Sequence, residues 1–196
     1  MVKLYSISKK KYALIISSAL NGFLTMMVTA FLGIFTSDIL VKEKLFFALV
    51  YLVIPVVPYL VLRKLRFIDD IDITKRKQRP LFFTIVYILY GIAYWIVLKK
   101  YGVCEFSNVA LCLFVAQFVL SVVNYFWKMS GHMTFAVVMF STICYLFRNK
   151  LLLLLFLFVP LLAWSRVILR KHTVAQVVLG TITSLIECIL IYGSFC

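Results

Sequence analysis

Long apolar stretches separated by short polar segments limit most strongly what this chain can form. A window of about 17–25 apolar residues predicts a membrane-spanning helix, because the hydrocarbon core of a bilayer is about 30 Å thick. Seven stretches of this kind follow one another: Ala13–Phe35, Leu45–Leu62, Leu81–Leu98, Val109–Phe126, His132–Phe147, Leu151–Leu169 and His172–Phe195. The fifth is short, so its helix is expected to begin near Ser130, and Pro160 is expected to kink the sixth.

Composition agrees with a membrane protein. Of the 196 residues, 64% are hydrophobic and only 14% are charged, whereas soluble domains are about 45–50% apolar. The sequence therefore predicts an all-α fold, a polytopic integral membrane bundle of six to seven transmembrane helices. We expect residues 1–196 to form a single domain.

The net charge of +14 has to be explained together with this apolar character. A strongly basic protein can bind the phosphates of nucleic acid. Here the lysines and arginines lie beside the apolar stretches, where anionic lipid headgroups are within reach. We therefore expect membrane lipids and phosphate groups as partners, and no nucleic acid.

Three polar segments between the spans hold the residue types that chemistry needs. They run from Arg63 to Phe83, from Lys128 to His132 and from Trp164 to Gly180. Two spans separate each segment from the next, so all three are predicted to emerge on the same side of the membrane. Guanidinium, ammonium and imidazole groups that meet at one face suit the binding of a phosphate group.

The order of these residues resembles the three signatures of the type 2 phosphatidic acid phosphatase superfamily. The matching residues are Arg79-Pro80, Ser130-Gly131-His132, and Ser165-Arg166 followed by His172. The resemblance covers roughly residues 69–180. The chain departs from the usual pattern at Asp72, Met129 and Gln176, where the family carries lysine, proline and aspartate.

Short bacterial members of the family look closer to this chain. They share an Arg-x-x-Arg first motif, a Trp-Lys-x-Ser second motif and a His-x3-Gln third motif. The corresponding residues here are Arg76 and Arg79, Trp127, Lys128 and Ser130, and His172 and Gln176.

The resemblance implies an enzyme that hydrolyses a lipid phosphomonoester or diphosphate without a metal or other cofactor. The implied substrates are phosphatidic-acid-like lipids, phosphatidylglycerophosphate or polyprenyl (di)phosphates. In this resemblance His172 matches the nucleophile that forms a phosphohistidine. His132 matches the acid that protonates the leaving oxygen, and Gln176 matches the residue that orients the nucleophile. The implied ligands of the substrate phosphate are Arg79, Arg166, Lys75, Arg76, Ser130, Gly131 and Lys128.

The chemistry of phosphoryl transfer suits these residue types. A phosphoryl group in flight spreads negative charge over three oxygens, so the protein mainly has to supply preorganised cations and in-line geometry. Ser130 is expected to cap the fifth span, with the N–H groups of Gly131 and His132 directed at the anion. The glycine would let the backbone approach that anion closely.

Other interpretations of the same residues stay open. The histidine chemistry also suits a lipid phosphotransferase, in which an alcohol replaces water, and Met129 and Gln176 would also fit a non-catalytic relative. Ser130 can be a helix cap and no more, and basic residues beside spans often only set topology. The aspartates at 69, 70 and 72 can be salt-bridge partners or hold a divalent ion, although prenyltransferase chemistry would need a second aspartate-rich motif, which is absent.

Charge distribution also predicts the sidedness of the polar segments. The amino-terminal lysines fall on their side of the membrane, and the positive-inside rule places such a side in the cytoplasm. These lysines are Lys3, Lys9, Lys10 and Lys11. We therefore expect a bacterial cytoplasmic membrane protein with the site on the cytoplasmic face.

Overall fold

The computed structural model describes residues 2–70 and 72–193, and it describes side chains from residue 8 onward. Within these residues the chain forms helices and connecting segments, without strands. The α-helices are α1 (Val2–Ala19), α2 (Gly22–Thr36), α3 (Val41–Ala48), α4 (Val56–Lys64), α5 (Arg79–Tyr101), α6 (Glu105–Phe126), α7 (Gly131–Phe147), α8 (Phe158–Ile168) and α9 (Val174–Tyr192).

The predicted all-α membrane bundle is confirmed. Among the described residues, six helical segments are long and apolar enough to cross a membrane, and Gly131–Phe147 is a shorter apolar helix. The six are Ser8–Thr36, Val41–Lys64, Arg76–Tyr101, Glu105–Phe126, Lys150–Ile168 and Val174–Tyr192. The expected end of the last span at Phe195 lies outside the described residues.

The first predicted span corresponds to the segment Ser8–Thr36, whose helix is interrupted at Asn21. Asn21 has extended backbone angles and its side-chain oxygen accepts from the N–H groups of Phe23 and Leu24, so it ends α1 and caps α2. Gly22 allows α2 to approach α7, because a Cβ there would lie 3.0 Å from the carbonyl of Gly131. The break therefore creates a helix start inside the span, against the start of α7.

Proline alters the helix type in two other spans. Between α3 and α4 the chain forms a π-helical segment, Leu49–Val53, just before Pro55. In the sixth span a 3-10 segment, Lys150–Leu157, precedes α8. Pro160 lies in the first turn of α8, where its missing N–H costs little. The helix therefore changes from 3-10 to α just before this proline, close to the position of the expected kink.

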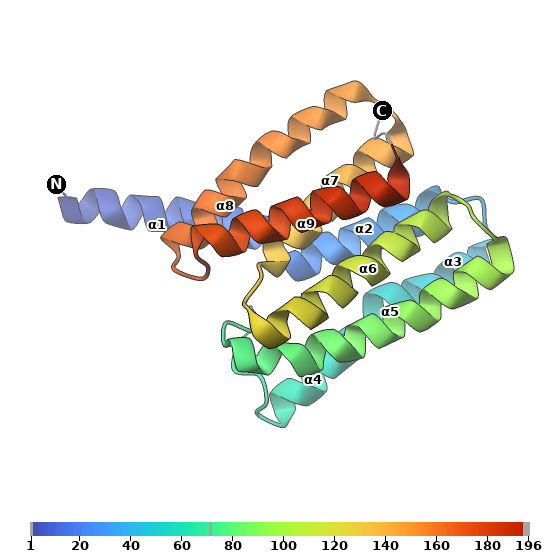
Figure 1. The fold of residues 1–196 in the computed structure, drawn as a ribbon, viewed down its shortest axis with the longest axis horizontal. Coiled ribbons are helices and arrows are strands. Elements are labelled where there is room, and N and C mark those ends of the chain that lie inside the picture. The colour runs from blue at the N-terminus through green and yellow to red at the C-terminus, as the bar shows by residue number, and fades with distance from the viewer. Residues whose placement is uncertain (1, 71, 194–196) are drawn as a thin grey trace.

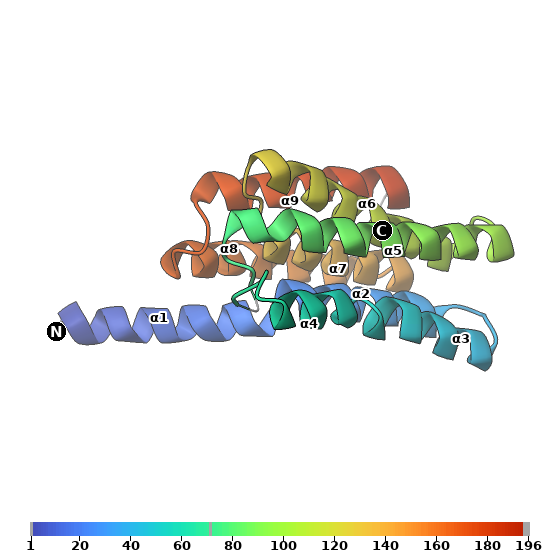
Figure 2. The ribbon, with the colours of Figure 1, turned by 90° about the horizontal axis from the view of Figure 1, so that it is seen from below.

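Helix α7 lies at the centre of the bundle. It packs against α2, α6, α8 and α9, and nearly all of its side chains from His132 to Cys144 are buried. In Figure 2, α7 lies between α2 on one side and α6 with α9 on the other. The start of α7 is therefore surrounded by other elements.

The helices α2, α5, α7 and α9 all begin at the same end of the bundle (Figure 1). The positive ends of their backbone dipoles therefore point toward that end. The three polar segments meet there, as the parity of the spans predicts, because their side chains contact one another. This end of the bundle favours negative charge.

Candidate functional site

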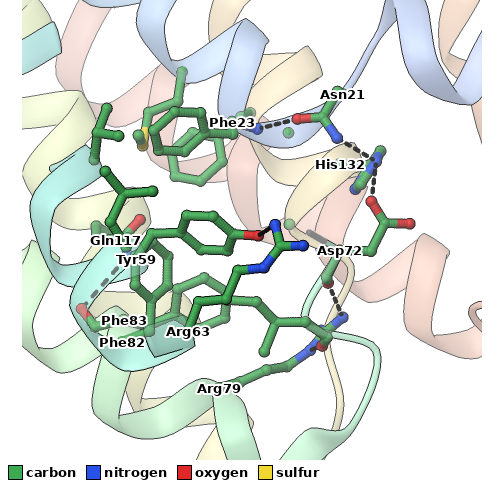
Figure 3. Close-up of a pocket in the computed structure, with 17 residues that line it drawn as sticks. Asn21, Phe23, Tyr59, Arg63, Asp72, Arg79, Phe82, Phe83, Gln117 and His132 are labelled. Atoms are coloured by element: carbon green, nitrogen blue, oxygen red, sulfur yellow. Dashed lines mark hydrogen bonds and ion pairs between the residues drawn. The ribbon is translucent and has the colours of Figure 1, made fainter. Parts of the chain in front are cut away.

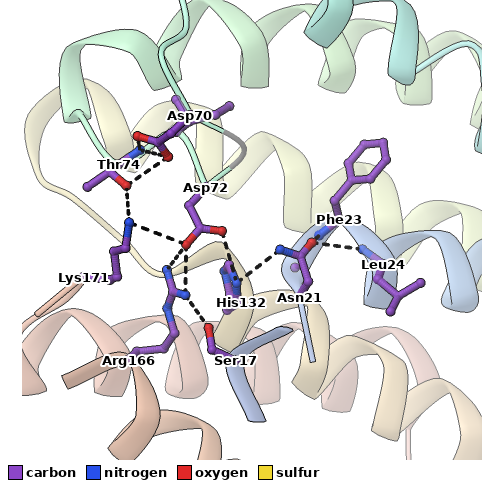
Figure 4. A network of polar contacts seen from close by, with 12 residues as sticks. Ser17, Asn21, Phe23, Leu24, Asp70, Asp72, Thr74, His132, Arg166 and Lys171 are labelled. Atoms are coloured by element: carbon purple, nitrogen blue, oxygen red, sulfur yellow. Dashed lines mark hydrogen bonds and ion pairs between the residues drawn. The ribbon is translucent and has the colours of Figure 1, made fainter. Parts of the chain in front are cut away.

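A single carboxylate joins the three polar segments (Figure 4). Oδ2 of Asp72 accepts from both Nη1 and Nη2 of Arg166, each at 3.2 Å. The same oxygen lies 3.9 Å from Nζ of Lys171, and Oδ1 lies 3.8 Å from Nε2 of His132. The arrangement is an anion site that the chain fills with its own aspartate.

Arg166 is the most deeply buried cation of this network. It belongs to the last turn of α8 and is 1% exposed. Besides its bonds to Asp72, Nη1 donates to Oγ of Ser17 in α1 at 2.6 Å, and Nε has no partner among the described residues. A buried guanidinium needs such partners, because transferring its charge from water to the protein interior costs roughly several kcal/mol of free energy.

Arg79, at the start of α5, is used differently. Its Nε donates to the carbonyl of Ile73 at 2.6 Å, and its Nη1 donates to the carbonyl of Met129 at 2.8 Å and to Oδ1 of Asn124 at 3.3 Å. Within the described chain, Nη2 makes only a 3.4 Å bond, to the carbonyl of Asp72. Arg79 therefore ties the first polar segment to the second, and Nη2 is its most weakly bonded nitrogen.

His132 stands in the first turn of α7, between the carboxylate and the break in the first span. Its Nε2 is 3.5 Å from Nδ2 of Asn21. The expected cap by Ser130 is not formed: its Oγ makes no capping bond and is buried without a partner among the described residues. Ser130 adopts φ −87° and ψ 102°, and its carbonyl, not its hydroxyl, bonds to the first turn.

Gly131 is open to the site. A Cβ at this position would meet only Leu120, at 3.8 Å, which is an ordinary contact. Helix packing therefore does not require glycine here, and Gly131 lines the apolar cavity described below.

His172 and Gln176 are in the predicted contact. Nδ1 of His172 and Oε1 of Gln176 are 3.1 Å apart. Burial, together with the positive charges of Arg79, Arg166 and Lys128, lowers the pKa of His172 to about 2. The imidazole is therefore neutral near pH 7, although cations surround it.

The side chain of Gln176 also takes part in the N-cap of α9. Its Oε1 also accepts from the N–H of Thr173, while Oγ1 of Thr173 accepts from the N–H of Gln176. This reciprocal pair is a capping box that starts α9. The same amide oxygen thus fixes both the helix start and the orientation of the His172 ring.

Two lysines complete the cationic cluster. Nζ of Lys128 donates to the carbonyl of Lys171 at 2.7 Å, and Nζ of Lys171 donates to Oγ1 of Thr74 at 2.9 Å. Partial burial and the like charges of Arg79, Arg166 and Lys171 lower the pKa of Lys128 to about 8. Lys128 is therefore close to losing its charge just above neutral pH.

Lys75 and Arg76, predicted ligands of the phosphate, lie outside the cluster. The ammonium of Lys75 pairs with Asp69 at 2.5 Å and its side chain is 70% exposed. Arg76 donates to the carbonyl of Tyr125 on the surface of the bundle. Residues three apart on an α-helix would share a face, so the Arg-x-x-Arg spacing predicted that Arg76 and Arg79 lie together. Because Arg76–Gln78 is a 3-10 turn, Arg76 lies apart from Arg79.

The three aspartates of the first polar segment do not converge. Asp69 pairs with Lys75, Asp70 accepts from the N–H and hydroxyl of Thr74, and Asp72 enters the cationic cluster. Nowhere in the described part of the chain do three or more His, Cys, Asp or Glu side chains gather as metal ligands.

An apolar cavity of about 260 Å³ ends at the same place (Figure 3). Asp72, Arg79, Gly131 and His132 line its polar end. Side chains of α2, α4, α5 and α7 form the apolar remainder. They are Phe23, Met26, Val56, Tyr59, Leu60, Phe82, Phe83 and Phe135.

Several site residues were not predicted. Ser17 and Asn21 lie in the first apolar stretch, Asn124 ends the fourth span, and Lys171 was not among the predicted ligands. The signal was present for Asn21, because Asn-Gly marks a turn and a polar side chain within a span is costly.

The lowered pKa of Lys128 predicts that binding of an anion to the cationic cluster depends on pH. Between pH 7 and pH 9 Lys128 passes from mostly charged to mostly neutral, so the affinity for sulfate, which does not titrate in this range, should fall. His172 stays neutral throughout and contributes nothing to this change. Titration calorimetry of the purified protein should give a several-fold loss of affinity. Lys128→Arg should remove the pH dependence, and a slope unchanged by this substitution would contradict the assignment.

Comparisons of the chain with models of known families, with curated proteins and with solved structures found no match. The chemistry of the site therefore has to come from its own residues: cations, imidazoles and one carboxylate at the end of an apolar cavity.

Proposed function

We propose that this chain is an integral-membrane enzyme that removes phosphate from a lipid phosphate through a phosphohistidine, without a metal. The observation that carries the proposal is the convergence of Arg166, Lys171, Lys128, His132 and His172 at one end of the bundle, where His132 also lines an apolar cavity. Ionisable groups gathered at a membrane face are costly and usually functional. The resemblance to the type 2 phosphatidic acid phosphatases agrees with this function.

In the proposed reaction His172 attacks phosphorus and the bond from phosphorus to the lipid oxygen breaks. The negative charge of the bound phosphate favours the protonated form of His132, which gives its proton to that oxygen, so the lipid leaves as an alcohol. Water then attacks the phosphohistidine, His132 takes the proton, and inorganic phosphate and free His172 result. The cations stabilise the charge that develops on the phosphoryl oxygens.

The environment of His172 supports its role as nucleophile. A nucleophile needs a free lone pair, and the lowered pKa keeps the ring unprotonated at working pH. The bond from Nδ1 to Gln176 leaves Nε2 as the attacking atom. Gln176 can orient the ring but supplies no negative charge.

The cavity supports a lipid as the substrate. At about 260 Å³ it lies near the lower end of ligand sites, about 300 Å³. It can hold the beginning of an alkyl or isoprenoid chain whose headgroup reaches the cations. Phosphatidic-acid-like lipids, phosphatidylglycerophosphate and polyprenyl (di)phosphates all meet this requirement.

We also propose that the site faces the cytoplasm of a bacterial cell. Helix α1 extends beyond this end of the bundle (Figure 2), and Lys9, Lys10 and Lys11 on it are exposed. Exposed lysines beside a span favour the cytoplasmic side. None of the three belongs to the cationic cluster, so they are evidence independent of the site.

The central test is phosphate release from a lipid phosphate by purified protein in detergent with excess EDTA. Release should persist on chelation, and His172→Ala should abolish it. Arg166→Ala should lower the rate about 10²–10³-fold, the usual effect of losing one preorganised charge-stabilising donor. Release that stops on chelation and returns with Mg²⁺ would refute the mechanism. Release only when an alcohol acceptor is present would favour the phosphotransferase.

The two tasks of Gln176 can be separated. Gln176→Leu should lower turnover well below wild type, because it leaves the His172 ring N–H unpaired. It also breaks the capping box, so Thr173→Ala, which breaks that box and leaves the ring contact, is the matched control. Gln176→Glu should keep activity with a shifted pH profile, since a carboxylate raises the histidine pKa. Equal losses of turnover in Gln176→Leu and Thr173→Ala would mean that only the cap matters.

Filling the cavity tests the lipid assignment. Val56→Trp places a large side chain in the cavity, whereas Val57, the next residue of α4, is 50% exposed and does not line the cavity. Val56→Trp should raise KM for long-chain lipid phosphates and leave turnover of a small aryl phosphate near wild type. Val57→Trp should change neither. If Val56→Trp affects both substrates equally, the cavity does not bind the chain.

A further inference from the structure

Asp72 holds the place that a bound anion would take. Its carboxylate contacts Arg166, Lys171 and His132 (Figure 4). The residue also lines the polar end of the cavity, together with His132. Among the described residues no other carboxylate forms an ion pair with these three residues, so Asp72 is their neutralising partner.

We infer that Asp72 is an internal occupant of the anion site, and that a phosphate binds there by displacing this carboxylate from Arg166, Lys171 and His132. The inference rests on the proposed function only for the identity of the natural anion. Inorganic phosphate has the same recognition chemistry and is the probe used below.

We expect a phosphate to displace Asp72 because this carboxylate occupies the terminal N–H groups of Arg166 that a ligand could reach. Both terminal nitrogens of Arg166 donate to the same oxygen of Asp72, and Nη1 also donates to Ser17. A phosphate bound end-on to this guanidinium would need the edge that Asp72 covers, and Nε, which has no partner among the described residues, is buried out of reach of solvent. Two anions in contact at a buried site repel each other strongly, so they do not share it.

The backbone around Asp72 is suited to movement. The described residues 66–70 and 72–75 form no α-helix, and the side chain of Asp72 is still 22% exposed. Ile73 has φ 44°, a conformation that β-branched residues rarely adopt and that stores strain. Its carbonyl is held by Arg79. Arg79 can therefore anchor the segment while Asp72 swings out beside it.

The first test compares two aspartates of the same segment. Asp72→Asn removes the competing charge with little change of shape, and Asp70→Asn removes a nearby charge that is linked to the cluster only through Thr74. By titration calorimetry, Asp72→Asn should bind inorganic phosphate about tenfold more tightly or better, because one charge-assisted contact no longer has to be broken. Asp70→Asn should change the affinity much less. Equal gains in the two variants would show only a long-range charge effect and would overturn the inference, as would unchanged or weaker binding to Asp72→Asn.

The second test uses the unaltered protein, so it does not depend on how a variant folds. Saturating inorganic phosphate should speed hydrogen–deuterium exchange in peptides covering residues 69–75, since the segment loses its bond to Arg166. Slower or unchanged exchange there would contradict displacement. Neither measurement requires turnover. Tighter binding by Asp72→Asn without lipid hydrolysis would reject the enzyme alone, whereas hydrolysis without the gain in binding would reject the displacement alone.

Discussion

The burial of two guanidinium groups at one end of an apolar bundle is the constraint on which the rest of this end depends. Arg79 and Arg166 are 3% and 1% exposed, and an unpaired charge at such positions would be strongly destabilising. The chain meets the cost in two ways. Main-chain carbonyls of the polar segments surround Arg79, whereas a carboxylate and a serine hydroxyl hold Arg166.

These two solutions have different consequences. Carbonyls belong to the backbone and cannot be exchanged for a ligand, so Arg79 fixes the connection of the first polar segment to the second. A carboxylate on a connecting segment can be exchanged, so in the proposed reaction Arg166 is the guanidinium that accepts the substrate phosphate. Burial, together with the same crowding of positive charge, lowers the pKa of Lys128 and His172. The cations proposed to bind the anion thus also help to keep the proposed nucleophile unprotonated.

Periodic and cumulative features of the sequence predicted the fold well. The apolar stretches gave the spans and their order, and counting spans placed the three polar segments at one end. What failed was local. The break at Asn21 depends on one capping side chain, and the direction of Lys75 and Arg76 depends on a single 3-10 turn. Apolar length does not encode either feature.

The site was predictable where a contact is local and not where it is distant. His172 and Gln176 are four residues apart on a helix start, so their contact follows from spacing alone. The bond between Ser17 and Arg166 spans 149 positions and arises from the packing of α1 on α8. Likewise, the sequence placed Asp72 among candidate salt-bridge partners without identifying Arg166 as its partner.

Asp72 stands where the resembling family carries a lysine, and this reversal of charge is consistent with the rest of the site. A lysine at this point would add a cation to Arg166, whose guanidinium already lacks a partner for Nε among the described residues. In this chain Lys171 reaches the same point from the third polar segment, 3.9 Å from the carboxylate. A second ammonium beside Arg166 and Lys171 would increase the repulsion that already lowers the pKa of Lys128. The aspartate relieves that repulsion while the site is empty, and an incoming phosphate, which carries more negative charge, can take over the same contacts.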